Sequence, residues 1–455
     1  MGNLSIKKNY KPTKTKLLKT IDKIPTSKIQ RASKLVQTGA KVGVNYLKYY
    51  GDRLTKTEDE SKERLNENNA EDIYNSLKTL KGSALKVAQM LSMEKSILPQ
   101  AYVEKFSLAQ FSVPPLSAPL VIKTFKKYFG KLPTEIYDKF KVTSVNAASI
   151  GQVHIAEKHG KKLAVKIQYP GVADSIASDL ALVKPIAIKM FNIKGKDSGK
   201  YFKEVEDKLR EETNYLLEIE QSKTIVDACK HIPNLHFPEY YEELSSERII
   251  TMDWMEGEHL SEFTAHNTNK ALANTLGQAL WDFYMYQIHI LRKVHADPHP
   301  GNFLIAKNGK LIALDFGCMK AVPEDFYIPY FELAKPEVIN DKKLFKEKMY
   351  ALEILKSDDS ETEIEFFSDM FFDMLSLFTK PFHNETFNFS DEAFFNAIAE
   401  LGERYSKNTE LRKMNGNRGS KHFIYINRTF FGLYNLMFDL KSENIKINNF
   451  KKLIN

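Results

Sequence analysis

The chain has 455 residues, of which 43% are hydrophobic and 27% are charged, and it contains only two cysteines. A chain of this length can bury a large core, and two cysteines cannot build a disulfide framework, so we expect roughly two to three domains in a reducing compartment. Because no run of 18 apolar residues occurs, we expect no membrane-spanning helix. These features predict a cytoplasmic protein, either free or held peripherally at the inner face of a membrane.

The net charge of +8 is unevenly distributed, since residues 1–20 contain six lysines and no acidic residue. One interpretation is a solvated, frayed arm at the chain terminus. The other is peripheral attachment to anionic lipid, because each basic residue near such a surface contributes about 1 kcal/mol. No nucleic-acid recognition motif accompanies the charge, so a nucleic-acid partner is not expected.

Residues 52–72 are charged and rich in asparagine, which is typical of an exposed linker or a polar helix. Six apolar residues then recur at intervals of three and four, the spacing of one face of an amphipathic helix. These are Ile73, Leu77, Leu80, Ala84, Val87 and Leu91. Prolines at positions 99, 114 and 115 predict a break after this helix.

Strands dominate the prediction for the middle of the chain and helices dominate after it. The elements expected there are a strand at 150–156, a turn at 157–160, a strand at 163–167, a helical region at 200–228, a strand at 248–254, a helical stretch at 268–294, and short strands at 304–305 and 311–314 about Gly309. The remainder of the chain is predicted to be mostly helical and rich in phenylalanine.

Two short segments carry the strongest chemical signal: His-Ala-Asp-Pro-His-Pro-Gly-Asn at 295–302 and Leu-Asp-Phe-Gly at 314–317. Asp297 and Asn302 have the spacing of Asp and Asn in the protein-kinase loop H-R-D-L-x-x-x-N, and Asp315 opens a D-F-G. Mg²⁺ prefers hard oxygen ligands, so Asn302 and Asp315 are candidate metal ligands. Asp297 would orient an incoming hydroxyl group or water. Asp297 or Asn302 alone would be interpreted as a turn residue.

Lys166 lies in a predicted strand whose letters, L-A-V-K-I, match the V-A-I-K strand of protein kinases. Strand alternation places Leu163, Val165 and Ile167 on one face and Lys166 on the other. Lys166 can therefore reach phosphates while its neighbours fill the core. The alternative is an ordinary exposed strand lysine.

Kinases pair this lysine with a glutamate on a helix. The candidates are Glu212 and Glu218, which lie six residues apart and are predicted to occupy different faces of one helix. Such a placement would let them serve two partners. The alternative for each is a solvated position on a charged helix.

The glycine-rich loop that precedes the lysine in ordinary protein kinases is absent. Ala147 and Ala148 stand in its place, and alanine lacks the φ freedom of glycine, so this loop should be stiffer and hold phosphates differently. No long activation segment follows Asp315, since residues 322–324 begin only seven residues further on. Both features argue against an ordinary protein kinase. The order of elements still predicts a two-lobed α+β fold of the protein-kinase type.

These residues resemble the UbiB/AarF family of atypical, protein-kinase-like proteins, and the resemblance covers roughly residues 70–440. It is carried by the Ala-rich loop ending in S-I-G-Q-V-H at 149–154, by the Lys166 strand, and by the segments around Asn302 and Asp315. The family's K-x-G-Q motif reads Lys-Val-Ala-Gln at 86–89 in this chain.

The resemblance implies an N-terminal helical extension packed over the active site, with Lys86 and Gln89 covering the pocket. Ala88 replaces the family glycine. Glu212 would belong to an acidic E-x-D element, in which Asn214 stands where the family has Asp.

The same resemblance implies that ATP and Mg²⁺ are bound and that Asp297, Lys166 and Glu218 are the catalytic residues. Glu218 would be the partner of Lys166, with Asn302 and Asp315 as metal ligands. The implied ATP contacts are Ala147, Ala148, Ser149, Ile150, Gly151, Val153, Lys166 and Met255.

The expected domains are a basic and polar N-terminal arm with a linker at 1–70, a helical extension at 71–118, a kinase-like N-lobe at 119–256 and a helical C-lobe at 257–455. The resemblance implies an ATPase or small-molecule kinase in isoprenoid-quinone (ubiquinone-like) biosynthesis or membrane-lipid handling, with contacts to lipid or a quinone precursor. The alternatives are a small-molecule phosphotransferase of the aminoglycoside or choline kinase type, and a non-catalytic scaffold that senses ATP.

Overall fold

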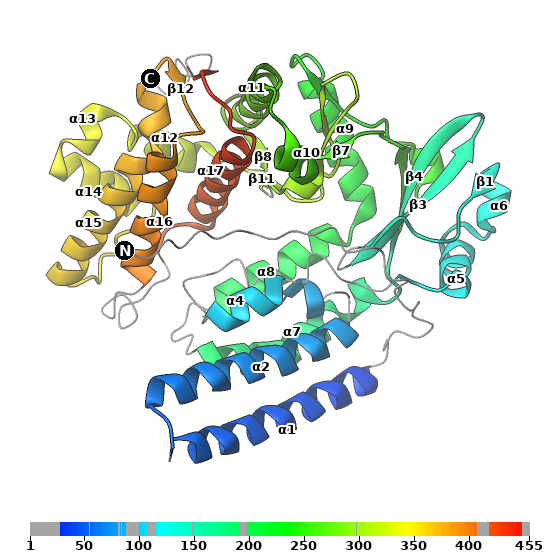
Figure 1. The fold of residues 1–455 in the computed structure, drawn as a ribbon, viewed down its shortest axis with the longest axis horizontal. Helices are drawn as coiled ribbons and strands as arrows, with labels where there is room; N and C mark the ends of the chain where they lie inside the picture. Colours follow the sequence, from blue (N-terminus) through cyan, green and yellow to red (C-terminus); the bar gives the residue numbers. More distant parts are fainter. Residues whose placement is uncertain are drawn as a thin grey trace. The chain divides into compact units, whose positions relative to one another are not determined.

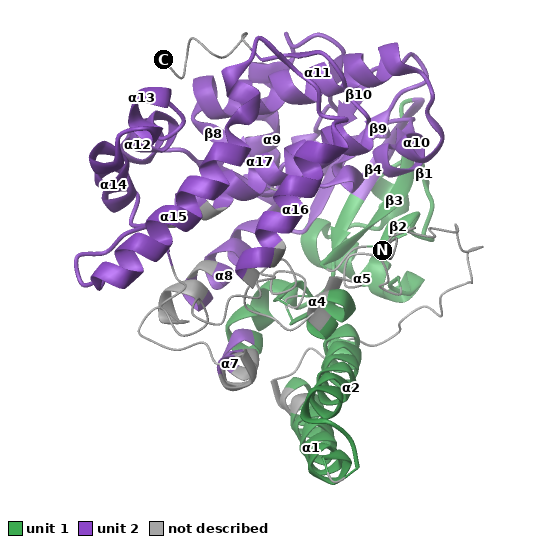
Figure 2. Cartoon of the chain, turned by 60° about the vertical axis from the view of Figure 1, so that its left-hand side comes forward, with its two compact units in different colours: residues 1–93, 99–159, 166–179 green, residues 94–98, 160–165, 180–455 purple. Residues whose placement is uncertain are grey.

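The chain forms two compact units (Figure 2). The first contains residues 1–93, 99–159 and 166–179, and the second contains residues 94–98, 160–165 and 180–455. Strand β4 (Lys161–Gln168) and helix α7 (Val172–Phe191) contribute residues to both. The computed structural model describes residues 28–53, 55–80, 82, 84–87, 100–107, 115–147, 150–191, 198–296, 298–406 and 418–447.

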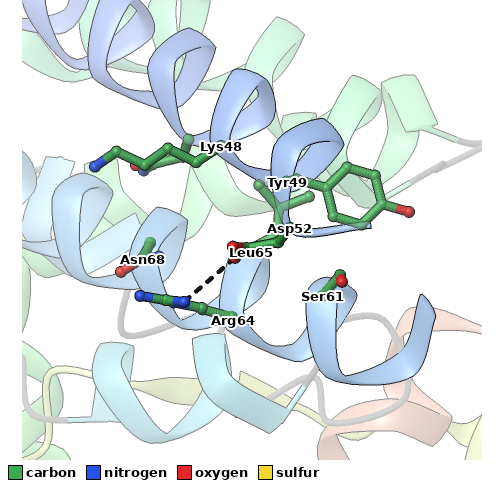
Figure 3. A pocket seen from close by; sticks show the side chains of 8 residues that line it. Lys48, Tyr49, Asp52, Ser61, Arg64, Leu65 and Asn68 are labelled. Atoms are coloured by element: carbon green, nitrogen blue, oxygen red, sulfur yellow. Dashed lines mark hydrogen bonds and ion pairs between the residues drawn. The ribbon is translucent and has the colours of Figure 1, made fainter. Parts of the chain in front are cut away.

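The first unit contains a helical hairpin, in which α1 (Lys28–Asp52) packs along α2 (Glu58–Leu80) (Figure 1). Acidic residues fill the first turn of α2, where they complement the helix dipole. The buried face of α1 is polar, whereas Val36 and Leu47 are 72% and 73% exposed. A cavity of about 300 Å³ lies between α1 and α2 and is lined mainly by polar side chains (Figure 3). The other elements of this unit are α4 (Gln100–Ser107), α5 (Ala118–Phe129), α6 (Pro133–Ile136), β1 (Lys139–Phe140), β2 (Asn146–Ala147) and β3 (Gly151–Lys158).

Helix α2 confirms the first part of the predicted apolar face, because Ile73, Leu77 and Leu80 are buried, but it ends at Leu80. Ala84 and Val87 are also buried, in a helical stretch at 84–87 that follows Gly82, whose φ is 58°.

Helix α2 begins at Glu58 rather than near residue 73, so most of the charged segment is a polar helix and not a linker. Its polar residues are retained in the helix because several of them bond to α1, among them Asn69. The last residue of the predicted face, Leu91, lies outside the described residues.

The predicted strands and turn at 150–167 are confirmed as β3 and β4. They are joined by His159 and Gly160, whose φ values of 49° and 75° place two consecutive residues in the left-handed region. This is the backbone of a type I′ hairpin turn, whose twist matches that of the flanking strands. Strands β1 and β2 both pair antiparallel with β3, with Asn146 opposite Val153.

The second unit is mostly helical. Its helices and strands are α8 (Ser198–Glu212), α9 (Tyr215–Cys229), β5 (Leu235–His236), β6 (Ile249–Asp253), β7 (Glu258–His259), α10 (Leu260–His266), α11 (Lys270–Tyr286), β8 (Lys293–His295), β9 (Phe303–Ile305), β10 (Leu311–Ala313), β11 (Met319–Ala321), α12 (Glu324–Glu332), α13 (Pro336–Ile339), α14 (Lys342–Ala351), α15 (Glu361–Phe378), β12 (Thr386–Phe387), α16 (Glu392–Ser406), α17 (Lys421–Asp439) and β13 (Ile445–Lys446).

The core of the second unit is aromatic and is centred on α11. Trp281 is fully buried, with its ring 5.6 Å from that of Phe382 and 5.7 Å from that of Phe389. Such aromatic pairs add about 0.5–1.5 kcal/mol each beyond their buried area. The prediction of a helical, phenylalanine-rich C-terminal region is confirmed. No helix within the described ranges is both long enough and apolar enough to cross a membrane.

Four short strands form a sheet in the order β5-β10-β9-β7. Strand β10 is parallel to β5 and antiparallel to β9, and the hairpin between β9 and β10 contains Gly309 with φ 77°. Strands β8 and β11 form a separate antiparallel pair. The short strands predicted around Gly309 are therefore confirmed, and the two strand pairs hold the candidate catalytic segments.

The helix predicted over 200–228 is wrong in one respect, because it is two helices. Helix α8 ends at Glu212 and α9 begins at Tyr215. Asn214 causes the break: its side chain accepts a hydrogen bond from the backbone N–H of Leu217 at 3.2 Å and so caps α9. Glu212 and Glu218 therefore lie on different helices rather than on two faces of one.

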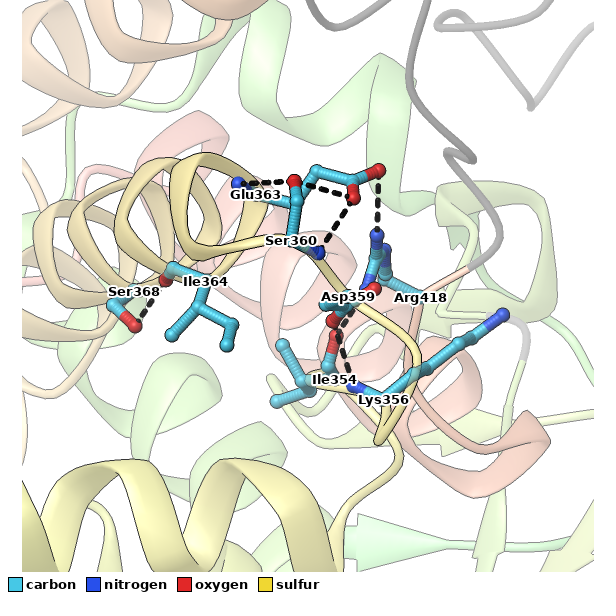
Figure 4. A network of polar contacts seen from close by, with 8 residues as sticks. All are labelled: Ile354, Lys356, Asp359, Ser360, Glu363, Ile364, Ser368 and Arg418. Carbon is cyan, nitrogen blue, oxygen red and sulfur yellow. Dashed lines mark hydrogen bonds and ion pairs between the residues drawn. The ribbon is translucent and has the colours of Figure 1, made fainter.

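A buried ion pair connects the start of α15 to the segment before α17 (Figure 4). The guanidinium of Arg418 pairs with Asp359, and their side chains are 3% and 5% exposed. It also lies 3.9 Å from the centre of the Phe367 ring. Ser360 and Glu363 form a capping box at the start of α15 beside this pair. These contacts fix where α15 begins relative to α17.

Candidate active site

The β9–β10 hairpin brings two of the predicted metal ligands to one edge of the sheet. Phe303 lies opposite Ala313, and the backbone N–H of Leu314 donates to the carbonyl of Asn302 at 3.0 Å. Asn302 directly precedes β9 and Asp315 closely follows β10, so an antiparallel pairing must place them together. Both side chains are half-buried.

Gly317 marks the point where two carboxylates approach each other. Its backbone N–H donates to Asp315 Oδ1 at 2.9 Å. A Cβ atom at this position would lie 3.3 Å from Asp315 Oδ1 and 3.3 Å from Glu218 Oε2, so a larger residue would press on both carboxylates. Glu218 is only 5% exposed. Two partly desolvated carboxylates beside the same residue favour a nearby cation, either a metal ion or an amine.

The chain leading to Asp297 is attached to the D-F-G by a pair of strands. Met319 lies opposite His295, and Ala296 N–H donates to the carbonyl of Cys318 at 2.9 Å. The buried ring of His295 lies 5.9 Å from that of Phe316. Asp297 itself lies outside the described residues, so its catalytic role stays a prediction.

The D-F-G backbone is anchored on its other side as well. Phe316 is 1% exposed, and its ring lies 5.9 Å from that of Phe237 and 6.3 Å from that of Phe283. The Tyr240 hydroxyl donates to the carbonyl of Leu314 at 2.8 Å. These contacts hold Asp315 in place through its two neighbours.

Three residues that sequence reasoning did not single out connect this region to α8. Lys320 on β11 pairs with Glu211 at 2.6 Å, and its ammonium group lies 5.2 Å from the centre of the Tyr425 ring. Tyr425 packs with Ala296 and Cys318. Cys318 is therefore a buried residue of this small cluster. Glu211 and Lys320 are 109 residues apart, so no local pattern could have revealed the pair.

Two other predicted site residues lie in the second unit: Glu212, expected in the acidic element, and Met255, expected to contact ATP. Glu212 is the last residue of α8 and is 8% exposed. Met255 is half-buried and follows β6, next to Trp254, whose N–H donates to the carbonyl of Lys162 at 3.0 Å. Asn214 is exposed and serves as the cap of α9.

The predicted residues of the first unit lie on β2, β3 and β4. Ala147 is in β2, Gly151 and Val153 are in β3, and Ile150 directly precedes β3 and is 9% exposed. Ala148 and Ser149 lie outside the described residues.

Lys166 is half-buried on β4, while Leu163, Val165 and Ile167 are buried, as strand alternation predicted. Because Lys166 belongs to the first unit and Glu218 to the second, the pairing of these two residues stays a prediction. Lys86 is half-buried in a helical stretch, and Gln89 lies outside the described residues.

Two polar residues of the S-I-G-Q-V-H segment have a structural role. Gln152 accepts a hydrogen bond from Leu116 N–H at 2.7 Å and contacts His154 Nε2 at 2.8 Å. His154 Nδ1 lies 3.0 Å from the carbonyl of Lys141, which can only accept, so Nδ1 carries the proton and Nε2 accepts from Gln152. Burial lowers the pKa of His154 to about 4, which keeps the ring neutral.

The motifs and their connections define a protein with a kinase-like fold. A structure that supports the fold is the complex of Rv3197 with erythromycin from Mycobacterium tuberculosis, with a TM-score of 0.58 and 23% identity over 87% of this chain and 98% of that one. The model of the ABC1 atypical kinase-like domain matches residues 108–349. The chain therefore belongs to the ABC1 family, the UbiB/COQ8 type of atypical kinases.

Curated relatives of this family match most of the chain. It is 27% identical to the mitochondrial atypical kinase COQ8 of Saccharomyces cerevisiae over 87% of this chain and 80% of that one. It is 25% identical to the probable serine/threonine-protein kinase abkA of Dictyostelium discoideum over 85% of this chain and 73% of that one. A chloroplastic relative, ACTIVITY OF BC1 COMPLEX KINASE 8 of Arabidopsis thaliana, is 29% identical over 52% of this chain and 32% of its own length.

Proposed function

We propose that this protein binds Mg-ATP and transfers its terminal phosphoryl group to water or a small acceptor. Two observations support the proposal. The β9–β10 hairpin brings the backbone of Asn302 beside Leu314, which precedes Asp315. The carboxylates of Asp315 and Glu218 both lie beside Gly317. Asn302 and Asp315 fit Mg²⁺, which takes few protein ligands beside phosphates and needs hard oxygen donors.

The remaining roles follow from the chemistry of phosphoryl transfer, which depends on positioned phosphates and a positioned nucleophile. In this proposal Lys166 binds phosphate oxygens and Glu218 orients Lys166. Asp297 orients the nucleophile. The backbone of residues 147–153 and Met255 contact the nucleotide. Lys86, Gln89 and Glu212 cover or border the pocket.

A small acceptor is favoured over a protein substrate because the segment after Asp315 is short. Strand β11 begins at Met319 and α12 begins at Glu324, which leaves no room for the long loop on which protein kinases dock a peptide. The resemblance to the UbiB family supports a role in isoprenoid-quinone biosynthesis or membrane-lipid handling. We propose that the acceptor, or a ligand that stimulates turnover, is a lipid or a quinone precursor at a membrane surface.

The test is ATP hydrolysis by the purified full-length protein, with vesicles present, compared with Asp315→Asn. Loss of a metal ligand removes several kcal/mol of transition-state stabilisation, so turnover should fall by at least about 100-fold. Asp341→Asn is the matched control, because this exposed side chain caps α14 and asparagine caps equally well. Its turnover should equal that of the wild type.

Equal turnover by the wild type and Asp315→Asn would show that the assigned site is wrong. A thermal shift of the wild type with Mg-ATP, combined with turnover no higher than that of Asp315→Asn, would instead favour a scaffold that senses ATP. Rapid ATP consumption on addition of an amino alcohol or an aminoglycoside would favour the small-molecule phosphotransferase.

A further inference from the structure

A glycine on helix α17 contacts the loop at 296–302, which carries Asp297 and Asn302. A Cβ atom built at Gly432 would overlap Pro298 Cγ, well inside the 3.0 Å that real Cβ atoms keep, and would lie 3.1 Å from the Pro298 carbonyl oxygen. A proline ring and a backbone carbonyl cannot turn aside as the end of a flexible side chain can. The loop therefore lies this close to α17 because residue 432 has no side chain.

Glycine is otherwise a poor choice at position 432. The residue lies inside α17, where glycine costs about 1 kcal/mol of helix stability relative to alanine. The helical backbone there suits alanine as well as glycine. The neighbouring Thr429 and Leu433 are fully buried, so this turn of the helix is held firmly in the core. The close approach of Pro298 accounts for the glycine.

The same face of α17 also packs against the residue on the other side of Asp297. Tyr425 precedes Gly432 by seven residues, which is about two helical turns, so the two residues share one face of the helix. Tyr425 packs with Ala296 and Cys318, and all three are buried. Helix α17 therefore lies along β11 and contacts both sequence neighbours of Asp297 (Figure 1).

The loop is stiff beyond Pro298, so a displacement there is transmitted along it. Proline has a fixed φ, and a turn of 3-10 helix follows directly at Pro300–Asn302. In this turn the Asn302 N–H donates to the carbonyl of His299 at 2.9 Å. A proline also restricts the backbone of the residue before it, which is Asp297 in this sequence. The position of the Pro298 ring therefore affects the candidate metal ligand on one side and the candidate catalytic residue on the other.

We propose that α17 holds the 296–302 loop in its working position and that Gly432 is a positioning residue for Asp297 and Asn302. This inference rests on the proposed function, in which Asp297 orients the nucleophile and Asn302 binds the metal ion. Helix α17 lies outside the residues 108–349 that match the ABC1 domain, so this role falls to a part of the chain beyond that match.

Gly432→Ala should disturb the loop without weakening the helix. Pro298 must move by roughly 1 Å to regain an ordinary contact, and a displacement of that size in a catalytic group can cost about 100-fold in rate. We expect kcat for ATP hydrolysis by the full-length protein to fall by about this factor. The thermal midpoint should change little, because alanine is the better helix former.

Two other helical glycines provide matched controls. Gly402 lies in α16, and a Cβ atom there would have no neighbour within 4 Å, so Gly402→Ala should leave kcat unchanged. Gly277 lies in α11, and a Cβ atom there would overlap the side chain of Ser442, in a segment that carries no candidate site residue. Gly277→Ala should lower the thermal midpoint, while kcat measured well below that midpoint stays near the wild-type value.

Removing the Pro298 ring should rescue Gly432→Ala. Pro298→Ala deletes Cγ, and the remaining atoms of residue 298 lie 3.1 Å and 3.2 Å from the added Cβ atom, so they need to shift only slightly. The double variant Gly432→Ala, Pro298→Ala should therefore hydrolyse ATP at about the rate of Pro298→Ala alone. Such non-additivity is expected of two residues in direct contact.

Hydrogen–deuterium exchange follows the loop independently of turnover. The backbone N–H groups of Ala296, Asn302 and Leu314 all donate to backbone carbonyls in or beside the loop. Peptides that contain them should exchange faster in Gly432→Ala than in the wild type, because the displaced loop opens more often. Exchange in the double variant should match that in Pro298→Ala, and Gly402→Ala should match the wild type.

Two results would overturn the inference: unchanged kcat and exchange in Gly432→Ala, or losses in the double variant that simply add. A lower thermal midpoint of Gly432→Ala with kcat and exchange of the loop unchanged would leave the glycine a packing role only. If the wild type and Asp315→Asn hydrolyse ATP equally, the proposed function fails. Faster exchange in Gly432→Ala, restored in the double variant, would then still show that Gly432 positions the loop.

Discussion

Single side chains in this protein connect segments that are distant in sequence. The Glu211–Lys320 pair joins the end of α8 to the strand after the D-F-G, and Gly317 allows the carboxylates of Asp315 and Glu218 to approach one point. Lys320 is therefore a positioning residue in the proposed mechanism. It touches neither substrate nor metal in this assignment and acts through the segments that carry them.

Replacing Lys320 should lower turnover while leaving the fold intact. Lys320→Met breaks the ion pair with Glu211, which frees the D-F-G segment from α8, and we expect kcat for ATP hydrolysis to fall about tenfold. Lys320→Arg should recover most of it. The control is Lys223→Met, which breaks a 2.6 Å pair with Glu242 at exposed positions.

For each Lys320 variant, kcat and KM for Mg-ATP are measured separately, together with the thermal midpoint of unfolding. If Lys320→Met lowers the thermal midpoint but leaves kcat unchanged, the role of Lys320 is structural. An equal effect of Lys223→Met on kcat would show that the substitution acts through net charge.

His154 makes stability depend on pH. Its pKa is lowered to about 4 in the folded state by burial, against an ordinary value of 6.5, so the unfolded chain binds the proton more readily. The contribution of the neutral ring is complete above pH 6.5 and is lost as the pH falls from about 6.5 towards 4. Over that window the folded protein should lose up to about 3 kcal/mol.

Thermal midpoints measured between pH 7 and pH 4 test this expectation. His154→Gln should give a shallower dependence on pH than the wild type, whatever its stability at neutral pH. Some dependence should remain, because burial also lowers the pKa of His289 to about 3. Parallel pH curves for the two proteins would show that His154 does not supply the effect.

Helix ends determine how the elements are arranged. Asn214 stops one helix and starts the next, which separates Glu212 from Glu218. The capping box of Ser360 and Glu363 starts α15 beside the buried Arg418–Asp359 pair. In both places a polar side chain caps backbone N–H groups that the start of a helix leaves without partners. Beside α15, Arg418 also supplies the cation that the buried Asp359 needs.

Arg418 should be among the residues most important for stability. Arg418→Met keeps much of the side-chain volume but leaves Asp359 buried without its cation, which typically costs about 3–5 kcal/mol. Arg404→Met is the matched control. Arg404 pairs with Asp373 at 2.9 Å with a 63% exposed side chain, and exposed pairs contribute about 1 kcal/mol or less.

Urea unfolding, followed by a signal from the second unit, measures the stability of both variants. The midpoint should fall strongly for Arg418→Met and little for Arg404→Met. Similar small changes in the two would mean that water reaches Asp359 and that the pair is not buried in solution.

At the scale of the whole molecule, much of the secondary structure and the chemistry-bearing segments could be predicted from local pattern. The β3–β4 hairpin followed from apolar alternation and a turn, and the β9–β10 hairpin followed from two apolar runs about Gly309. Asn302 and Asp315 then had to meet, because an antiparallel hairpin brings its two ends together. The break at Asn214 was missed because helical propensity on both sides outweighed one capping residue in the pattern.

The sequence by itself determined the family resemblance, the candidate residues of the site and the period of each main element, because these depend on residues close together in the chain. The tertiary structure alone decided which groups from distant segments meet. It brought Glu218 to Gly317 and Lys320 to Glu211, and it turned the apolar face of α1 outward. An amphipathic pattern shows that a helix has two faces, whereas only packing and hydrogen-bond partners decide which face is buried.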